Sequence, residues 1–212
     1  MSTTAEMSVE RNSPARQRIH MAAMKLFAEK GATQLAVSEL ATAAGVARGT
    51  IYNHLTDAHA LFEQVAEQLV DEMSERLTRS FDGIDDSAVR MAQGIRFYVR
   101  RAHEEPHWGR FMTRFAYSNR PLRRLWATGP GVNLKAGIED GRYAVRPEQT
   151  RAMIGMLAGG VISAMAAVID GDLTWRTAGS DTAELLLVAL GIAREEARSI
   201  ATLELPPFPA LA

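Results

Sequence analysis

The feature that most constrains this chain is a helix-turn-helix pattern over residues 36–55. Apolar residues recur at positions 37, 40, 41 and 44, which is the spacing of one buried helix face. Gly45 then supplies the backbone freedom that a tight turn needs. A second short helix is expected from Arg48 to Leu55, with Ile51 and Leu55 one turn apart as its buried pair. The pattern predicts two helices that pack against each other across a turn.

The second helix of this pattern carries a compact polar face. At about 100° per residue, its polar positions point away from the buried pair. Their side chains suit the edges of DNA bases and the phosphates. The predicted DNA-contacting residues on this recognition helix are Arg48, Gly49, Thr50, Tyr52, Asn53 and His54, to which we add Ser38 on the preceding helix. We expect Arg48 to read guanine and Asn53 to read adenine in duplex DNA.

The residues around this pattern resemble the TetR/AcrR-type family of bacterial transcriptional repressors. The matching pieces are AAMKLFAEKGA at 22–32, SELATAAGVARGTIYNHL at 38–55, and the helix opening at Asp57 with Leu61 and Phe62. The resemblance runs from about residue 15 to residue 69 and is only generic further on. It implies an N-terminal DNA-binding domain and a C-terminal domain that binds a ligand and dimerises. In this family, the positions of Thr50, Tyr52 and His54 commonly contact phosphates.

Four positions depart from the pattern of that family. Where the family often has Thr, Arg, Ser and Lys, this chain has Ala36, Ser38, Ala47 and Ala58, in that order. The alanines at 36 and 47 remove oxygens that would cap helices, and the other two changes remove cations for phosphates. We therefore expect DNA binding with a shallow salt dependence, or binding that relies on the N-terminal arginines and on dimerisation. The departures also leave open a domain that has become a protein-interaction module.

Helical periodicity and helix-breaking residues predict an all-α fold, and no segment has the pattern of a strand. The expected helices span 14–30, the two helices of the motif, about 57–81 with Asp57 as its N-cap, a stretch ending near 104, 106–117, 121–140, 147–170, 181–190 and 194–202. We expect Gly129-Pro130-Gly131 to interrupt the stretch 121–140, because proline removes a helical hydrogen bond.

These elements group into an N-terminal three-helix DNA-binding domain and a C-terminal helical domain for ligand binding and dimerisation. The expected boundaries are a flexible arm at 1–14, the helix-turn-helix domain at 15–57, the effector-binding and dimerisation domain at 58–205, and an extended tail at 206–212. The chain has 212 residues, of which 47% are hydrophobic, which suits one large or two small domains with a buried core. It has no cysteine and no apolar N-terminal segment, so we expect a cytoplasmic protein without disulfides.

Two blocks of opposite charge follow each other in the middle of the chain. Residues 63–86 contain eight acids and two arginines, whereas residues 90–124 contain nine arginines and two acids. The simpler interpretation is that the helices pair these charges across their surfaces. The sharper alternative is that one or two of Arg96, Arg100 and Arg101 point into a pocket and bind an anionic effector.

An aromatic and methionine stripe lies in the same region, at the spacing i, i+3, i+4 and i+7 from Trp108. Such a stripe is more often core than pocket. The family resemblance, however, implies an effector cavity among these helices. The expected lining residues are Phe97, Arg100, Arg101, His103, Trp108, Phe111, Met112, Phe115, Trp126 and Met156. Gly129-Pro130-Gly131 is either the mouth of this cavity or only a loop. The effector is expected to be apolar or amphipathic, and anionic if the arginines face it.

His103 and His107 are four residues apart, a spacing that suits a metal on one helix face, but Pro106 breaks that helix. We therefore expect no metal site and no cofactor. The chain also contains no nucleophile elbow, no glycine-rich phosphate loop and no HExxH motif. A helical enzyme is accordingly the less favoured alternative to a DNA-binding regulator.

Residues 152–169 contain no charged side chain, which meets the minimum length of a membrane span. Their composition, rich in Gly and Ala, favours close helix packing instead, so no membrane is expected. The predicted dimer seam consists of Gly155, Gly159 and Ser163, together with Leu186 and Leu190 of a later helix; a buried monomer core is the alternative. The sequence thus predicts a homodimeric, ligand-responsive regulator, most simply a repressor that a small molecule releases from a pseudo-palindromic operator.

Overall fold

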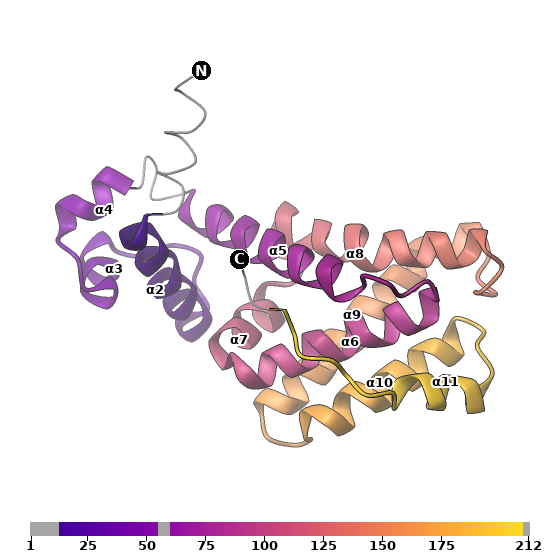
Figure 1. Cartoon of the computed structure of the whole chain (residues 1–212). Coiled ribbons are helices and arrows are strands. Elements are labelled where there is room, and N and C mark those ends of the chain that lie inside the picture. Colours follow the sequence, from indigo (N-terminus) through magenta and orange to yellow (C-terminus); the bar gives the residue numbers. More distant parts are fainter. Residues whose placement is uncertain (1–12, 55–59, 210–212) are drawn as a thin grey trace. The chain divides into compact units, whose positions relative to one another are not determined.

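The computed structural model describes residues 13–54 and 60–209, and these ranges contain helices and no strand (Figure 1). This confirms the predicted all-α class. The helices are α2 (Pro14–Lys30), α3 (Val37–Ala44), α4 (Arg48–His54), α5 (Leu61–Ser80), α6 (Ser87–Glu104), α7 (Pro106–Phe115), α8 (Arg120–Glu139), the 3₁₀ turn η1 (Pro147–Gln149), α9 (Thr150–Ile169), α10 (Trp175–Ala189) and α11 (Arg194–Ala201). Residues 1–12 of the predicted arm and the predictions for Leu55, Asp57 and Ala58 lie outside the described residues.

The chain divides into two compact units after Gln68. In unit 1, the ends of α2 follow directly from its sequence. The side chain of Ser13 accepts a hydrogen bond from the backbone N–H of Arg16, and Pro14 occupies the first turn. At the other end, Gly31 has a φ of 69°, and its N–H donates to the carbonyl of Phe27. The predicted bounds of this helix, residues 14–30, therefore match the bounds of α2 in the structure.

The core of unit 1 fixes the two helices of the motif against α2. Ile19 and Phe27 of α2, Leu40 of α3 and Ile51 of α4 are all almost fully buried. Phe27 also packs edge to face against Phe62, with ring centroids 5.1 Å apart. Because α4 is short and anchored through Ile51, this core determines which of its faces points outward.

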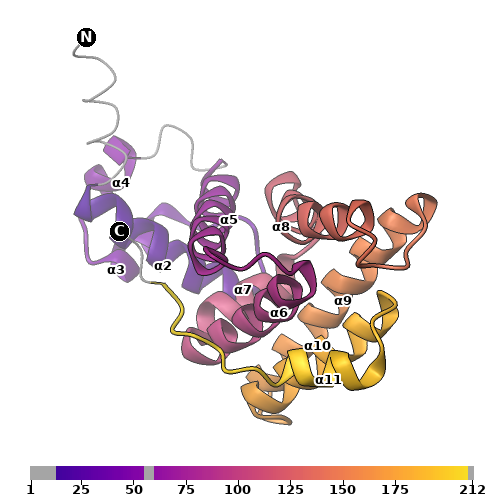
Figure 2. The same ribbon diagram turned by 45° about the vertical axis from the view of Figure 1, so that its right-hand side comes forward.

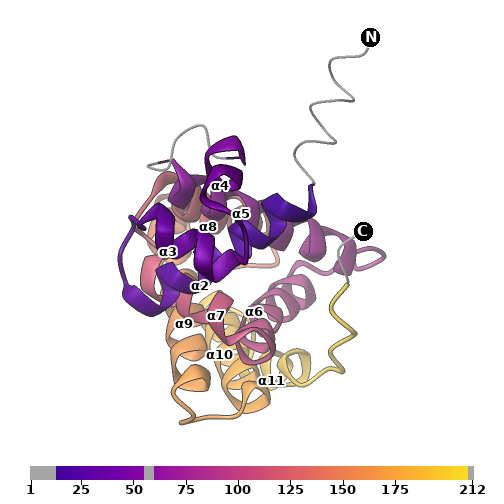
Figure 3. The same cartoon turned by 90° about the vertical axis from the view of Figure 1, so that its left-hand side faces the viewer.

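Unit 2 is built around α6, which packs against α7, α8, α9, α10 and α11 (Figures 1 and 3). Two glycines allow close approach of neighbouring helices. A Cβ at Gly109 of α7 would lie 3.0 Å from the Cβ of Ala102, and one at Gly179 of α10 would lie 3.4 Å from the Cγ of Arg96. The amphipathic α6 is thereby buried along most of its length, and its remaining face is available to form one wall of a site.

The chain after α11 runs back toward α5 as an extended strap, residues 203–209 (Figure 2). Arg76 of α5 donates to the carbonyl of Pro209 at 2.7 Å. Arg96 and Arg100 of α6 donate to the carbonyls of residues 203 and 206 at 2.6 and 3.4 Å. The ring of Phe208 stacks on Phe97, with centroids 4.6 Å apart, and the guanidinium of Arg76 lies 3.8 Å from the Phe208 ring centroid. The strap therefore ties the second half of α5 to α6.

Two predictions about helix bounds are wrong. Gly129-Pro130-Gly131 does not interrupt the chain, because α8 continues through Pro130. A proline removes one helical N–H, and here the packing of α8 against α6 and α9 outweighs that loss. The helix α10 begins at Trp175 rather than near residue 181, since the side chain of Thr174 caps it by accepting from the N–H of Thr177 at 3.1 Å.

Candidate DNA-binding helix and effector cavity

The helix α4 presents its polar residues to solvent in unit 1. Ile51 is 1% exposed and holds the helix on the core, whereas Tyr52 is 67% exposed. The predicted contact residues Arg48, Gly49 and Asn53 are exposed as well, and Thr50 and His54 are half-buried. The structure thus brings six of the seven predicted DNA-contacting residues together on one short helix. The seventh, Ser38, is exposed on α3.

The electrostatics of the motif depend on few groups. No side chain caps α3 at Ala36, and the residue before α4, Ala47, also has no side-chain oxygen. Glu39 is the single acid in residues 32–54, and Lys30 of α2 forms an ion pair with it. This pair neutralises the charge that would repel DNA phosphates and leaves Arg48 as the exposed cation of α4.

Unit 2 contains a cavity of about 450 Å³ bounded by α5, α6, α8 and α9. Its lining residues are Ser74, Leu77, Thr78 and Phe81 from α5 and its end, Arg90, Met91, Gly94, Ile95 and Tyr98 from α6, Leu125, Trp126, Thr128, Gly129, Pro130, Val132, Asn133 and Ala136 from α8, and Leu157 and Val161 from α9. The volume is within the range of small-molecule sites, and the walls are mostly apolar, as such sites usually are.

Of the ten residues that we predicted to line an effector pocket, Trp126 lines this cavity. The stripe formed by Trp108, Phe111, Met112 and Phe115 is buried elsewhere in unit 2. Phe97 packs under the strap. The structure therefore places the stripe in the core of unit 2, away from the cavity walls. Both locations need apolar side chains at helical spacing, so the pattern could not separate them.

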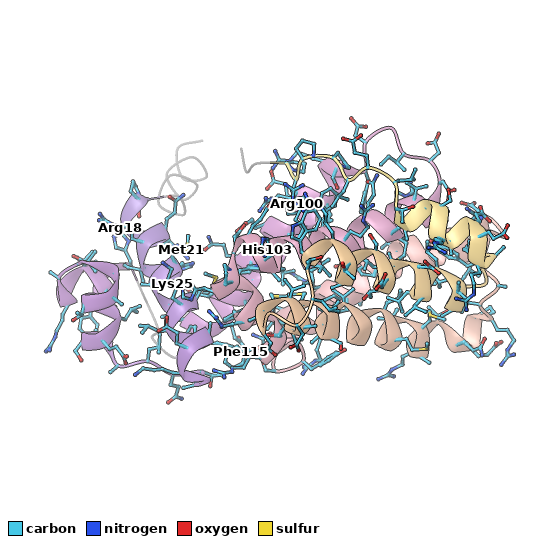
Figure 4. The ribbon with its side chains drawn as sticks, turned by 90° about the horizontal axis from the view of Figure 1, so that it is seen from below. Arg18, Met21, Lys25, Arg100, His103 and Phe115 are labelled. Carbon is cyan, nitrogen blue, oxygen red and sulfur yellow. The ribbon has the colours of Figure 1, made fainter. Side chains whose placement is uncertain are left out.

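The remaining predicted lining residues are exposed on unit 2 or form ion pairs. Arg100 and His103 lie on α6, where His103 is exposed (Figure 4). Arg100 pairs with Glu104 at 2.8 Å. Met156 of α9 is 52% exposed. None of these residues belongs to the described lining of the cavity.

The two charge blocks meet in ion pairs within unit 2. Arg101 is buried, pairs with Glu72 of α5 and with Glu105 at 3.0 Å, and lies 4.5 Å from the ring centroid of Trp108. Arg76 of α5 also bridges these acids, at 3.7 Å from Glu72 and 3.4 Å from Glu105. Of the three candidate arginines, Arg101 pairs with an acid across helices, which is the simpler interpretation. Arg100 pairs with Glu104 of its own helix, and Arg96 donates to the carbonyl of residue 203.

Besides the predicted Trp126, the cavity is lined by Tyr98 and Arg90, which were not among the ten predicted lining residues. Tyr98 Oη and Trp126 Nε1 are buried and have no hydrogen-bond partner in the described part of the chain. Burial raises the pKa of Tyr98 far above its ordinary value, so its hydroxyl stays protonated. Arg90 is the one positively charged residue among the described residues that line the cavity. The spacing of residues 90, 94 and 98, one per helical turn, was the signal that could have identified this face.

The predicted dimer seam is partly at the surface of the protomer. Gly155, Gly159 and Ser163 are exposed on one face of α9, and a Cβ at either glycine would meet no atom within 4 Å among residues 13–54 and 60–209. Leu186 and Leu190 are instead buried within unit 2. Met156, which is also exposed, belongs to the same uncharged stretch of α9 as these three residues. This face is uncharged and flat, which distinguishes it from an ordinary solvated helix face.

The stretch Pro147–Ile169 is also long and apolar enough to cross a membrane, judged by length and composition alone. Its residues Met153, Leu157, Val161 and Met165 pack into the core of unit 2, as in the core helix of a globular protein. Among the described residues, no cluster of three or more His, Cys, Asp or Glu side chains could hold a metal ion.

A helix-turn-helix unit with an exposed polar second helix, followed by a helical unit with an apolar cavity, defines the class of ligand-responsive DNA-binding regulators. Residues 19–65 match the family model described as bacterial regulatory proteins, tetR family. Residues 86–203 match the tetracyclin repressor-like C-terminal domain. The chain belongs to the TetR family of transcriptional regulators.

Similar proteins agree with this family. The HTH-type transcriptional regulator AcrR of Shigella flexneri is 35% identical over 78 residues, which cover 35% of this chain and 36% of AcrR. The match thus spans about a third of that relative's length.

Among solved structures, ligand-free RolR is 26% identical, with a TM-score of 0.66 over 91% of this chain and 100% of RolR. FadR from Bacillus subtilis, in complex with stearoyl-CoA, is 21% identical, with a TM-score of 0.69 over 84% of this chain and 99% of FadR. At that identity, the similarity to FadR shows a shared fold.

Proposed function

We propose that this regulator is a homodimeric repressor in the cytoplasm, which a small-molecule effector releases from a pseudo-palindromic operator. The observation that carries the proposal is the outward polar face of α4, held on the core by the buried Ile51. In this geometry the helix enters the major groove with its exposed residues toward the bases. The proposal assigns the chain no catalytic role.

The residues of α4 divide between base and phosphate contacts. Arg48 is exposed at the start of the helix, where its guanidinium reads the two acceptors of guanine. Asn53 reads adenine in the same way, while Tyr52 and His54 donate to phosphates. At Gly49, a Cβ would meet no atom of the described residues within 4 Å, so the glycine leaves room for close approach of DNA. Thr50 and Ser38, each with a hydroxyl, complete the proposed contact set.

Dimerisation uses the uncharged face of α9. Gly155, Gly159 and Ser163 allow the same helix of a second protomer to approach closely around a two-fold axis. Met156, which is 52% exposed, and Leu185 of α10, which is 61% exposed, supply apolar area that a monomer would leave in water. Leu186 and Leu190 support this face from inside the protomer. The two recognition helices then enter successive major grooves.

The effector binds in the cavity between α5, α6, α8 and α9. Binding shifts operator affinity only if the effector prefers one of two spacings of the recognition helices. Related folds bind small molecules of different kinds, since RolR was solved with resorcinol (24% identity, TM-score 0.65, over 95% of this chain and 100% of RolR) and FadR with stearoyl-CoA. These ligands support a small-molecule effector for this chain. The chemistry of that effector depends on the cavity of this chain.

The test is a binding selection from random DNA duplexes with the purified full chain at two salt concentrations. We expect an enriched two-fold symmetric motif, bound by a dimer, with a shallow salt dependence. Arg48→Ala should weaken binding by about 1–3 kcal/mol and relax the preference at one base pair. The control Arg120→Ala removes an exposed charge from unit 2 and should leave binding unchanged. A folded dimer that enriches no motif would refute the proposal and favour a protein-interaction module.

A further inference from the structure

The helices α6 and α8 place polar groups at two opposite ends of the cavity. On α6, Arg90 and Tyr98 are eight residues apart, which corresponds to about 12 Å along the helix. On α8, Trp126 and Asn133 are seven residues apart, or about 10 Å. Arg90 contacts Asn133, and the ring of Tyr98 lies beside that of Trp126, with centroids 5.3 Å apart. Each end of the cavity therefore has one polar group from α6 and one from α8, since the two helices are antiparallel.

The first end consists of two unsatisfied donors. Tyr98 Oη and Trp126 Nε1 both belong to residues that line the cavity, and neither has a hydrogen-bond partner in the described chain. A buried donor without a partner loses its hydrogen bonds to water. Trp108 Nε1 and Tyr143 Oη are also unsatisfied in the described chain but lie outside the cavity lining, whereas Tyr98 and Trp126 belong to it. A ligand oxygen that reaches either group at this end of the cavity would accept its hydrogen bond and remove this cost.

The second end carries a positive charge, that of Arg90, which has no ion-pair partner among the described residues. Arg90 donates to the carbonyl of Ile84 at 3.1 Å and to Oδ1 of Asn133 at 3.4 Å. No carboxylate pairs with Arg90 within the described ranges. By contrast, Arg76 and Arg101 of the same unit are held in ion pairs. The guanidinium of Arg90 retains N–H groups for an anion, and a carboxylate is its best geometric partner.

Between these ends, the walls of the cavity are mostly apolar, and the hydroxyls of Thr78 and Thr128 donate to backbone carbonyls of their own helices. Met91 and Ile95 of α6 line the space between Arg90 and Tyr98, and Leu77, Leu157 and Val161 contribute from the other helices. A polar group in the middle of a ligand would lose its water there without finding a partner. The middle of the ligand must therefore be apolar.

We propose that the cavity selects an elongated apolar molecule that carries a carboxylate at the Arg90 end and an acceptor oxygen at the Tyr98–Trp126 end. This assignment rests on the proposed effector function of the same cavity. A hydroxylated aromatic acid is the class of molecule that fits. Its ring system fills the apolar middle, and its two oxygen groups satisfy the two ends together.

The test compares three probes that share one apolar body. The full chain is titrated by calorimetry with hydroxybiphenyl carboxylic acid, which carries its two groups at opposite para positions, with biphenyl carboxylic acid, and with phenylphenol. We expect the first to bind most tightly, about 3- to 10-fold better than the acid without hydroxyl and about 10-fold or more better than phenylphenol. Equal affinities for the three probes, or no binding of any of them, would overturn the proposal.

Substitutions assign the two ends separately. Tyr98→Phe should abolish the advantage of the hydroxyl, and Trp126→Phe should reduce it. Arg90→Gln should abolish the advantage of the carboxylate. Each change keeps the approximate shape of the side chain, and circular dichroism checks the fold. Tyr143→Phe is the matched control, because Tyr143 is equally buried but lies outside the cavity lining, so it should leave every affinity within about twofold.

Failure of this assignment is distinguishable from failure of the proposed function. A small molecule that releases the protein from its operator, yet binds the Tyr98→Phe and Arg90→Gln variants as tightly as the wild type, would overturn the ligand class and leave the repressor standing. Binding of the probes in the expected order, by a protein that selects no DNA motif, would support the ligand class and refute the repressor.

Discussion

Replacing Phe208 with alanine tests whether the strap stabilises unit 2. The substitution removes the stack on Phe97 and the contact with Arg76, and it leaves the three arginine-to-carbonyl hydrogen bonds in place. The stack is worth about 1 kcal/mol, the cation–π contact about 0.5–1 kcal/mol, and the burial of half the ring about 1 kcal/mol. We therefore expect the free energy of unfolding of unit 2 to fall by about 2–3 kcal/mol.

Tryptophan fluorescence reports this change selectively, since the three tryptophans of the chain, at positions 108, 126 and 175, all belong to unit 2. Unfolding in guanidinium chloride should show a lower midpoint for Phe208→Ala at unchanged slope. Leu203→Ala is the matched control from the same strap, because that side chain is 43% exposed and should change the stability by less than about 0.5 kcal/mol. Equal midpoints for Phe208→Ala and the wild type would refute the anchoring role of Phe208.

Three further predictions follow from burial and close packing. Gly137→Ala should destabilise unit 2 by about 1–3 kcal/mol in the same denaturation assay, because a Cβ there would lie 2.2 Å from the ring of the buried Tyr143; an unchanged midpoint would show that the ring moves freely. Gly159→Leu should turn the dimer into a monomer in analytical ultracentrifugation, without loss of helicity, if α9 forms the seam. Burial lowers the pKa of His20 below its ordinary 6.5, so the unfolded chain takes up a proton more readily than the folded one, and the stability of unit 1 should fall as the pH drops below about 6.5. Thermal unfolding by circular dichroism between about pH 7.5 and about pH 5.5 measures this loss, which should vanish in His20→Leu.

Local signals in the sequence were sufficient for most helices and for the recognition helix. Pro14 and Gly31 fix the ends of α2 through the proline and glycine preferences of helix termini, and both act in the structure as expected. Because Ile51 is buried, the helical spacing of side chains turns the polar residues of α4 outward. The prediction for Pro130 was wrong because the favourable packing of α8 is a tertiary effect, which a local rule about proline does not include.

The cavity could not be located from the sequence for a related reason. It is a space between four helices, so its position depends on how α5 and α8 are held apart rather than on any one stripe of residues. Trp108 and Trp126 have the same chemistry and both are buried, yet one is in the core of unit 2 and the other faces the cavity. The direction of each side chain matters as well, because Arg101 pairs with Glu72 of α5, while Arg90, on the same helix, pairs with no acid in the described part of the chain.

The strap also has a consequence for how its sequence can change in evolution. Three arginines of α5 and α6 hold it through backbone carbonyls, and every amino acid has the same carbonyl. Most strap positions can therefore accept substitutions without loss of these bonds, whereas Phe208, Arg76, Arg96 and Arg100 are constrained. The match to the family's C-terminal domain ends at residue 203, where the strap begins. An element that is held through its backbone is therefore marked less by its own residues than by the arginines that bind it.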